Sequence, residues 1–289
     1  MKMLRSLLFV PGNRPNMLDK ALGVRPDAYV PDLEDSVPDS EKDNARRVVA
    51  SYLERLGTAG PAVIPRVNSL HSGLLDDDLA AVVGPNIHGL SIGKIETVDD
   101  VEQLCDRVAV LERKTGAEVG SIKLIPWIET ALAMVHCYAI CSASPRIIGV
   151  AFGAEDFTND MGIERPEDDA ELAFARNTVC IAARAAGVAA LDTPYFQFRN
   201  EDGLRTSVRA GKAIGFKGKF AIHPAQIDGI NRGFSPSESE VAYAQRVVAA
   251  FEQAERSGRG STSLDGRVID VPVVKRARSL LALARSLWD

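Results

Sequence analysis

The stretches that decide the fold are residues 122–129, IKLIPWIE, and residues 147–156, IIGVAFGAED. In each, an apolar run of strand length leads to an acidic residue, Glu129 in the first and Asp156 in the second. The segment between the two runs has the apolar spacing of an amphipathic helix. Two strands joined by a helix predict a parallel pair, so both carboxylates should emerge at the same end of one sheet.

The same alternation of apolar runs and amphipathic segments extends along most of the chain. It predicts a parallel sheet, and eight strands are the number that closes a (β/α)8 TIM barrel. A doubly wound open sheet is the alternative, but the sequence has no GxGxxG after the first strand and no GxxxxGK[ST]. The strands are predicted at residues 6–10, 28–33, 62–67, 89–93, 122–128, 147–152, 189–191 and 219–222. The helices are predicted at residues 15–22, 40–56, 98–114, 130–141, 168–186, 203–214 and 224–231, with a weaker signal at 74–83.

Polar and charged residues follow nearly every predicted strand, and this favours the barrel. A TIM barrel builds its active site from the carboxyl ends of several strands, whereas an open sheet would spread such residues along a line. The residues concerned are Asn13, Arg14, Glu34, Asp35, Arg66, Asn68, Lys94, Glu96, Glu129, Glu155, Asp156, Asp192 and His223.

Composition narrows the function classes. Of the 289 residues, 46% are hydrophobic and 25% are charged, as in globular proteins. The net charge of −5 argues against a general nucleic-acid binder, and no apolar run approaches the ~20 residues of a membrane helix. The four cysteines form no CxxC pair and no disulfide framework, and residues 6–10 are too short a run for a signal peptide. We therefore expect a cytoplasmic protein without nucleic-acid or membrane partners.

Residues 234–289 predict an arm that follows a barrel of residues 1–233. The arm combines a helix at 236–256, a Gly/Ser hinge at 257–261, a hairpin around Asp265-Gly266 and a basic helix at 272–288. An appendage of this kind is either a lid or an oligomerisation arm.

Glu129 and Asp156 suit a hard divalent cation, Mg2+ or alternatively Mn2+, which prefers carboxylate and water oxygens. Such a metal polarises a carbonyl and stabilises a developing oxyanion. The competing interpretation makes both acids helix N-caps or surface residues. Glu34 and Asp35 would hold the waters of the metal, or are ordinary acids at a helix N-terminus.

Arg66 ends a strand that should be buried, and a buried arginine needs an anionic partner. That partner is either a structural carboxylate or, as we favour, a carboxylate or enolate oxygen of a substrate. His223 is interpreted as a structural residue. A Schiff-base aldolase, which needs a buried lysine, is disfavoured; Lys94 and Lys123 are the candidates considered for that lysine.

A set of motifs gives the chain a resemblance to the citrate lyase beta-subunit and malyl-CoA lyase family. These are Mg2+-dependent lyases of CoA thioesters within the HpcH/HpaI aldolase superfamily. The match spans nearly the whole chain, and the order and spacing of the motifs make it specific. The motifs are RSLLFVPG at 5–12, DLEDSV at 32–37, RVN at 66–68, IET at 128–130, FGAEDF at 152–157, GKFAIHP at 218–224 and DGRVIDVP at 265–272.

The resemblance implies a homotrimer or a hexamer in which Glu129 and Asp156 bind the metal. It implies that Arg66 contacts the substrate carboxylate and the enolate. It also implies that Asp270, carried on the arm of a neighbouring subunit, transfers a proton. The CoA thioester is expected near the first βα loop, at Pro11, Gly12 and Arg14. Other residues expected in catalysis or at the substrate are Glu34, Asp35, Lys94, Gly153, Ala154 and Glu155.

Two residues depart from the family pattern. Gly93 and Ala133 stand where relatives often have proline and glycine, and either change can reshape the pocket. They bear on the identity of the substrate and not on the chemistry.

We therefore expect a carbon–carbon lyase of the oxo-acid type that cleaves or forms a bond of a 3-hydroxyacyl-CoA. Malyl-CoA, citramalyl-CoA and citryl-CoA are candidate substrates, and the products are an acyl-CoA enolate and a 2-oxo acid. The alternatives are a CoA-independent 2-oxo acid aldolase and a non-catalytic or complex-dependent citrate lyase beta-like subunit. The arm around Asp270 favours a self-sufficient CoA enzyme.

Overall fold

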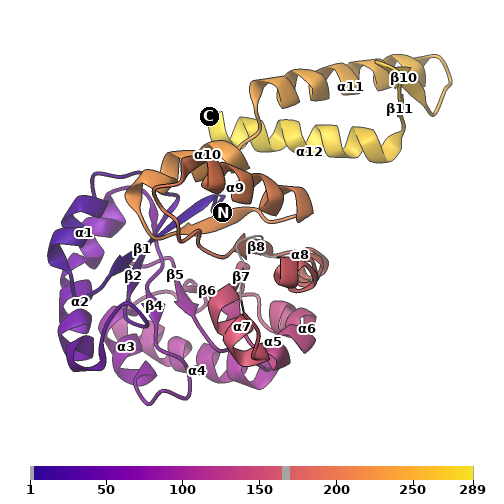
Figure 1. Ribbon diagram of the computed structural model, residues 1–289. Coiled ribbons are helices and arrows are strands. Elements are labelled where there is room, and N and C mark those ends of the chain that lie inside the picture. Colours follow the sequence, from indigo (N-terminus) through magenta and orange to yellow (C-terminus); the bar gives the residue numbers. More distant parts are fainter. Residues whose placement is uncertain (1–2, 165–169, 289) are drawn as a thin grey trace. The chain divides into compact units, whose positions relative to one another are not determined.

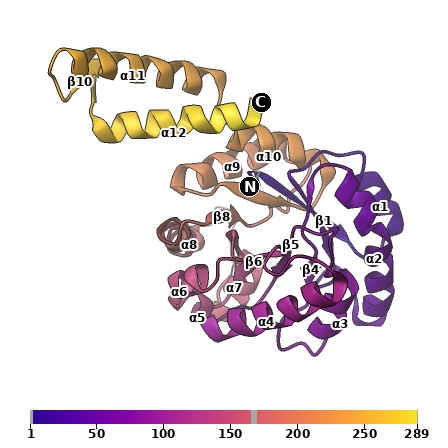
Figure 2. The same cartoon turned by 180° about the vertical axis from the view of Figure 1, so that it is seen from behind.

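The strands of the chain close into a parallel barrel with helices outside it (Figure 1, and from behind in Figure 2). The computed structural model describes residues 3–164 and 170–288. The barrel strands are β1 Ser6–Pro11, β2 Ala28–Asp32, β3 Ala62–Val63, β4 Arg66–Val67, β5 Gly89–Ile92, β6 Lys123–Ile128, β7 Gly149–Phe152, β8 Ala189–Asp192 and β9 Gly218–Ala221. They pair in the order β1-β9-β8-β7-β6-β5-β4-β2-β3, and a β1–β2 pairing closes the ring. The predicted TIM barrel is confirmed.

The third predicted strand, 62–67, is split into β3 and β4. Both pieces pair with β2, β3 at Ala28 and Tyr29 and β4 at Asp32, so they occupy one position in the ring. The break falls at Ile64-Pro65, where proline has no N–H to continue a ladder. Nine short strands therefore fill eight positions.

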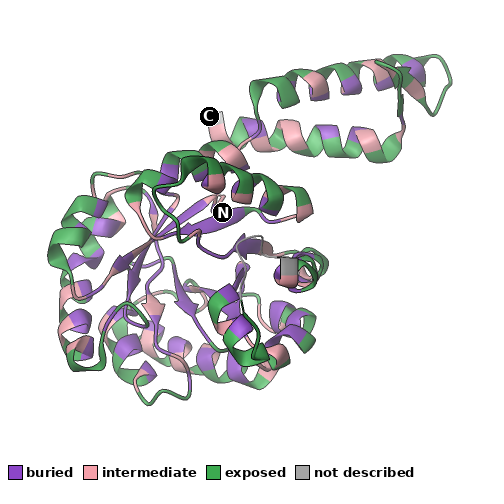
Figure 3. Ribbon diagram, in the orientation of Figure 1, coloured by how far each residue is buried: buried purple, intermediate pink, exposed green. Residues whose placement is uncertain are grey.

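Helices cover the outside of the barrel and turn their buried faces toward it (Figure 3). They are α1 Pro15–Ala21, α2 Lys42–Thr58, α3 Leu75–Val82, α4 Val98–Thr115, α5 Ala131–Val135, α6 Cys137–Ser142, α7 Ala154–Met161, α8 Ala173–Ala186, α9 Glu201–Ile214 and α10 Ile227–Phe234, with 3-10 turns at Asp39–Glu41, Ala170–Leu172 and Pro224–Gln226. No helix within the described ranges is long and apolar enough to span a bilayer.

The helices differ from the prediction at two places, and part of one predicted helix cannot be compared. The helix predicted at 130–141 is broken at His136, whose Nδ1 lies 2.9 Å from the carbonyl oxygen of Glu96. Residues 168 and 169 of the helix predicted at 168–186 lie outside the described residues. Helix α7 was not predicted, because its eight residues carry too few apolar positions to show a period. Its stability comes from tertiary contact, with the ring of Phe157 centred 5.6 Å from that of Phe152.

An aromatic layer fills the barrel interior below the carboxyl ends of the strands. The ring centroids of Phe9 and Trp127 are 5.8 Å apart, those of Phe9 and Phe220 are 5.0 Å apart, and those of Trp127 and Phe220 are 4.5 Å apart. Below them lie aliphatic side chains such as Leu7 and Ile125, which are completely buried. The interior is therefore a packed core that gives the site above it a rigid floor.

The chain divides into two compact units, Met1–Asn231 and Arg232–Asp289. The second unit contains α11 Glu238–Arg256, the antiparallel hairpin β10 Thr262–Leu264 and β11 Arg267–Ile269, and α12 Val271–Trp288. Asp265 and Gly266 both have positive φ angles, 51° and 73°, as a two-residue Asp-Gly hairpin turn requires. The predicted helices and hairpin of the arm are confirmed.

The arm has a hydrophobic core of its own. Ile269 is fully buried against Phe251, Val247 and Val274, and Val273 packs at the edge of this cluster. Helices α11 and α12 therefore provide the surface that buries Ile269 of the hairpin. Val268 and Val271 remain 71% and 48% exposed.

Closure of the barrel between β1 and β9 depends on Gly218. A Cβ atom at this position would overlap the carbonyl oxygen of Leu4 and lie 2.9 Å from that of Arg5. We predict that Gly218→Ala destabilises the protein by about 1–3 kcal/mol, because the overlapping atoms belong to the backbone and cannot move aside cheaply. Thermal unfolding should show a fall in melting temperature of roughly 2–10 °C. Gly84→Ala, which introduces a Cβ into open space, is the matched control; equal melting temperatures for the two variants would contradict the prediction.

Candidate active site

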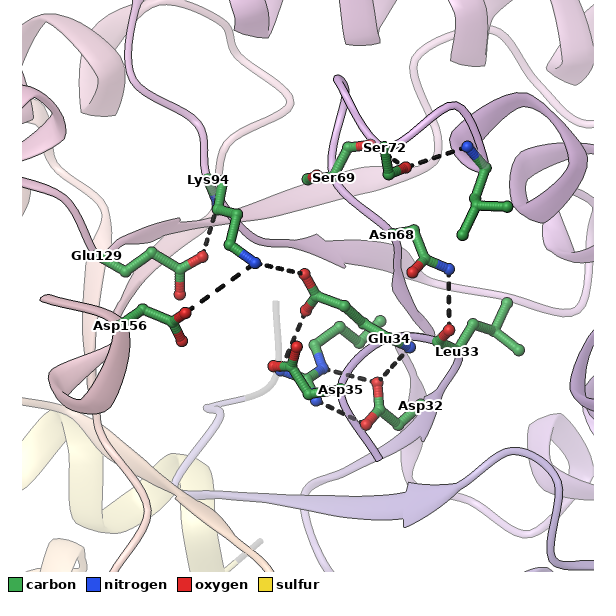
Figure 4. Close-up of polar contacts among 12 residues, drawn as sticks. Asp32, Leu33, Glu34, Asp35, Asn68, Ser69, Ser72, Lys94, Glu129 and Asp156 are labelled. Atoms are coloured by element: carbon green, nitrogen blue, oxygen red, sulfur yellow. Dashed lines mark hydrogen bonds and ion pairs between the residues drawn. The ribbon is translucent and has the colours of Figure 1, made fainter. Parts of the chain in front are cut away.

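Acidic side chains gather at the carboxyl ends of the barrel strands (Figure 4). Asp32 is the last residue of β2, and Glu34 follows it in the next loop. Glu129 directly follows β6, and Asp156 lies in the first turn of α7. The sequence interpretation that Glu129 and Asp156 emerge at one end of a parallel sheet is thus consistent with the arrangement.

Arg66 is held by a fork of two hydrogen bonds to Asp32. Its Nε lies 2.7 Å from Oδ1 of Asp32 and its Nη2 lies 2.6 Å from Oδ2. Its Nη1 donates to Asp35 at 2.9 Å and lies 3.1 Å from Glu34. The guanidinium also stacks over Phe9, 4.6 Å from the ring centroid. A protein carboxylate and a substrate oxygen were the two partners considered for Arg66. The structure shows the protein carboxylate, that of Asp32.

A buried polar network holds the loop that carries Glu34. The ammonium of Lys42 donates to the carbonyl oxygens of Leu33 and Glu34 and to Oδ1 of Asn68, each at 2.9 Å. Asn68 in turn donates its backbone N–H and its amide to Asp78. These contacts fix the backbone, so that Glu34 points toward Lys94 and Arg66 and away from the helices.

Glu129 is held in a narrow space by backbone. Its Oε1 accepts a hydrogen bond of 2.6 Å from the N–H of Lys94. A Cβ atom at Gly93 would lie 2.5 Å from the same oxygen, and a Cβ at Gly153 would overlap Oε2 and crowd the Cβ of Glu129. The Gly93 departure from the family pattern therefore lies directly against the predicted metal ligand.

Burial and mutual repulsion perturb the acids of this cluster. Burial, with the carboxylates of Asp156 and Glu34, raises the pKa of Glu129 to about 8. Burial also raises the pKa of Glu34 to about 7, although Arg66 opposes the shift. Asp32 differs: burial opposes ionisation, but the charge of Arg66 and hydrogen bonds from Arg66, Ser36 and the N–H of Glu34 together lower the pKa of this carboxyl. Groups that titrate near neutrality in a cleft are candidates for chemistry.

The cluster has the charge of a cation site. It holds the five carboxyl groups of Asp32, Glu34, Asp35, Glu129 and Asp156 but only two cations, Arg66 and Lys94, so full ionisation leaves three negative charges in excess. No group of three or more His, Cys, Asp or Glu side chains within residues 3–164 and 170–288 forms a complete metal cage. Two carboxylates with open positions suit Mg2+, which keeps water and substrate oxygens as its other ligands. The residues present therefore fit a divalent cation at Glu129 and Asp156.

A cavity of about 220 Å3 opens beside the cluster. Arg66, Glu129 and Asp156 line one part of it, and Phe9 and Trp127 line another. Its other lining residues include the predicted Asp35, Gly153, Ala154 and Glu155. A cavity of about 770 Å3 at the opposite end of the barrel, near Leu4, His88 and Lys123, has no comparable set of acids.

The first βα loop, with Pro11, Gly12 and Arg14, does not line the cavity beside the acidic cluster. Gly12 packs against β2, since its N–H donates to the carbonyl oxygen of Asp32 at 2.8 Å. Arg14 is exposed and precedes α1, and Pro11 ends β1. Asp270 belongs to the second unit, where its Oδ1 accepts a hydrogen bond from the N–H of Val273 at the start of α12. The roles expected for these four residues remain predictions.

Several residues of the site were not predicted. Asp32 is one, although it stands in the same Asp-Leu-Glu-Asp segment as Glu34, because a strand residue with no visible partner gives no signal. Thr193, Pro194 and Phe196 line the cavity from the loop after β8. Phe9 and Trp127 looked in the sequence like ordinary core residues.

His223 and Ser91 have structural roles. His223 accepts a hydrogen bond from the N–H of Ala225 through Nδ1 and stacks on Phe198, as its structural interpretation implies. Residues 89–93, GLSIG, fit the GxSxG pattern of hydrolase nucleophiles. Ser91 is nevertheless completely buried within β5, where it accepts a hydrogen bond from Nε1 of Trp127, so this segment is not a nucleophile elbow.

Fold and site together define a barrel enzyme with carboxylates and one arginine gathered at the carboxyl ends of its strands. Residues 5–224 match the family described as HpcH/HpaI aldolase/citrate lyase. The chain belongs to this family, and the prediction of a carbon–carbon lyase is confirmed by its membership.

Relatives of known name match over almost their whole length. The chain is 39% identical to citrate lyase subunit beta of Haemophilus influenzae, over 99% of this chain and 98% of the relative. It is 33% identical to the mitochondrial citramalyl-CoA lyase of Rattus norvegicus, over 99% of this chain and 87% of the relative. It is 35% identical to the (3S)-malyl-CoA thioesterase of Cereibacter sphaeroides, over 98% of this chain and 95% of the relative.

Among solved structures, the chain is similar to the protein CitE from Mycobacterium tuberculosis in complex with magnesium, acetoacetate and coenzyme A. That similarity has a TM-score of 0.81 at 29% identity and covers 98% of each chain. A citrate lyase beta subunit from the same organism, complexed with oxaloacetate and magnesium, matches with a TM-score of 0.67 at 28% identity, over 81% of this chain and 98% of the other.

The raised pKa of Glu129 predicts how metal and pH affect stability together. The folded carboxyl keeps its proton up to a pH of about 8, whereas the unfolded one releases it near 4.5. Without metal, this group therefore stabilises the fold most below pH 4.5, and the contribution is lost as the pH rises through 8. A divalent cation binds the deprotonated form, so Mg2+ should raise the melting temperature more at pH 8 than at pH 6.

The comparison uses wild type, Glu129→Gln and, as a control, Glu102→Gln at an exposed position of α4, each in EDTA and in Mg2+. The effect of Mg2+ and its dependence on pH should disappear only in Glu129→Gln. A Mg2+ effect that survives in Glu129→Gln would assign the cation to other residues.

Proposed function

We propose that the protein cleaves or forms the carbon–carbon bond of a 3-hydroxyacyl thioester, with CoA as the thiol. In the cleavage direction the hydroxyl loses its proton, and the bond between C2 and C3 breaks. The hydroxyl carbon becomes the carbonyl of a 2-oxo acid. The electron pair of the broken bond passes to the thioester as an enolate, which is then protonated at carbon. The names of the relatives support this reaction class, and malyl-, citramalyl- and citryl-CoA are the first substrates to assay.

The observation that carries the proposal is the shared wall of the small cavity. Arg66, Glu129 and Asp156 line a space of about 220 Å3, which suits a short oxo acid and is too small for a whole CoA molecule. The acid would therefore lie inside while the rest of the thioester extends outward, toward the first βα loop with Pro11, Gly12 and Arg14. A divalent cation held by Glu129 and Asp156 would supply Lewis-acid polarisation of the substrate oxygens.

Arg66 is suited to the anionic parts of this substrate. Its guanidinium has five N–H groups, and three of them make the hydrogen bonds to Asp32 and Asp35. The remaining N–H groups can donate to a carboxylate or an enolate oxygen. Because Asp32 fixes the plane of the guanidinium, these donors are oriented before the substrate arrives.

Two carboxyl groups are candidates to move the proton. Glu34 lies beside Arg66 with a pKa of about 7, and such a group can both accept and donate a proton near neutrality. The resemblance assigns the protonation of the enolate to Asp270 of a neighbouring subunit, and we retain this as the proposal. The arrangement requires a homo-oligomer, a trimer or a hexamer, in which the arm reaches an adjoining site.

The second candidate function is a citrate lyase beta-like subunit that acts only within a complex. It is favoured by the identities of 37–40% to citrate lyase subunits beta, which exceed those to the citramalyl-CoA lyases at 31–33%. Purified chain alone should be assayed with the three CoA thioesters and with free hydroxy acids, with and without Mg2+. Release of a 2-oxo acid from a CoA thioester would support the self-sufficient enzyme, and activity on free acids alone would indicate a CoA-independent aldolase. No turnover until carrier-bound thioester or partner subunits are added would favour the complex.

We predict that Glu129→Gln and Asp156→Asn each reduce Mg2+-dependent turnover at least ~100-fold, because the Lewis acid they would hold is worth several kcal/mol. Both substitutions keep the shape of the side chain, so far-ultraviolet circular dichroism should remain that of wild type. Steady-state release of the 2-oxo acid is the measurement. Full activity in EDTA, or in either variant, would rule out the proposed metal ligands.

The proposed sharing of sites predicts complementation between inactive variants. Asp270→Asn and Glu129→Gln would each be inactive alone, but a mixed oligomer contains sites in which neither residue is replaced. Mixing the two proteins under conditions of subunit exchange should restore part of the activity. A fully active monomer, or no recovery after exchange has been demonstrated with labelled subunits, would refute the shared site.

A further inference from the structure

Lys94 has a strained backbone at the centre of the acidic cluster. Its φ angle is 55°, in the left-handed region that side chains other than glycine and asparagine rarely adopt. Such a conformation is strained and persists only where its surroundings demand it. In this conformation the N–H of Lys94 points at Oε1 of Glu129, 2.6 Å away. The strain therefore places both the backbone and the side chain of Lys94 beside the proposed metal ligands.

The ammonium of Lys94 lies between carboxylates from two different elements (Figure 4). Its Nζ is 3.7 Å from Oε1 of Glu34 and 4.0 Å from Oδ1 of Asp156. Both distances are longer than hydrogen bonds, so the ammonium is held by charge and not by a fixed donor geometry. The side chain is 44% exposed, which leaves it free to move.

A polar cavity of about 490 Å3 adjoins the cluster, and Lys94 forms part of its wall. Glu34 and Asp35 also line it, together with the hydroxyl-bearing Ser69 and Ser72 and the carboxylate of Asp39. The ammonium of Lys42 also lines this cavity, but it is already held by the carbonyl oxygens of Leu33 and Glu34 and by Asn68. The oxygens of Ser69, Ser72 and Asp39 can accept hydrogen bonds from an ammonium that leaves Glu34 and Asp156. Lys94 thus has a second environment within reach of its own side chain.

We propose that Lys94 is an internal counter-ion of the acidic cluster, and that a divalent cation must displace its ammonium in order to bind. The inference rests on the proposed metal site at Glu129 and Asp156. The ammonium and the metal are attracted by the same excess of negative charge and repel each other at such short range. Lys94 therefore lowers the affinity of the site for the cation while it keeps the metal-free cluster neutralised. Once displaced, its positive charge is available to an anionic substrate.

Metal affinity tests the competition directly. Binding of Mn2+, followed by the electron paramagnetic resonance signal of the free ion, is measured on the full chain for wild type, Lys94→Met and Lys94→Gly. The methionine variant removes the charge but keeps the stem, and the glycine variant also suits the positive φ angle. Both should bind Mn2+ about 10-fold more tightly or better, a gain of about 1.4 kcal/mol. Lys114→Met, at an exposed position in the last turn of α4, is the matched control and should leave the affinity unchanged.

The displacement itself is tested by labelling. The rate at which an amine-reactive reagent modifies Lys94 is measured by mass spectrometry with and without Mg2+. Glu34 and Asp156 shield the ammonium in the metal-free protein, so Mg2+ should increase labelling of Lys94 and leave Lys114 unchanged. Mn2+ affinities of the Lys94 variants equal to or weaker than wild type, or Mg2+ binding without increased labelling, would overturn the inference. If wild type and every variant fail to bind Mn2+, the proposed metal site itself is wrong and the role of Lys94 falls with it.

Discussion

The ion pair between Asp32 and Arg66 is the interaction on which the mouth of the barrel depends. Two short hydrogen bonds join them across neighbouring strands. Without Arg66, Asp32 would be a buried, uncompensated charge, and breaking such a pair from one side typically costs roughly 3–5 kcal/mol. The pair also allows Glu34 and Asp35 to gather beside Arg66, because one cation is shared among three carboxyl groups.

The remaining acids, Glu129 and Asp156, form a site whose negative charge is only partly neutralised by the protein. Glu129 and Asp156 have no arginine of their own, and the only cation near both Glu34 and Asp156 among the described ion pairs is the loosely held Lys94. Protein groups that stabilise a structure are usually satisfied, whereas unsatisfied charge is kept where a ligand completes it. The Asp32–Arg66 pair thus has the features of a structural interaction, whereas the poorly neutralised Glu129 has those of a ligand-binding group.

The barrel strands and the longer helices could be predicted from the sequence, because they follow from the spacing of apolar residues and from the number of strands. The strand ending at Ile128 and the helix beginning at Val98 are long runs whose pattern is unambiguous. Helix α7 was missed because its eight residues are shorter than the window in which a helical period is recognised. The core of the arm was not predicted, since it depends on the packing of Ile269 against Val247 and Phe251 of α11, which a hairpin pattern does not contain.

The acids of the site could be located from their positions after strands, but their partners could not. Whether Arg66 meets a protein carboxylate or a ligand depends on the register between β2 and β4, which sets Asp32 opposite Arg66. The pKa of Glu129 depends first on burial and then on neighbours from other elements. The sequence indicates which residue types converge at one end of a barrel. Only the packing decides which of them already have a protein partner for their charge or hydrogen bonds.

The two glycines beside Glu129, Gly93 and Gly153, differ in how a substitution there would change the pocket. At Gly153 an added methyl group would strike the Cβ of Glu129, an atom fixed by the backbone, so every amino-acid change there displaces the acid as a whole. At Gly93 it would meet the carboxylate ends of Glu129 and Glu34, so Glu129 would lose its hydrogen bond from the N–H of Lys94 but could rotate aside. Position 153 therefore does not tolerate a side chain without displacing Glu129, whereas position 93 can tolerate a small one. A laboratory library aimed at new substrates would best keep the first residue constant and vary the second, where one small side chain re-aims the acid without dismantling the barrel.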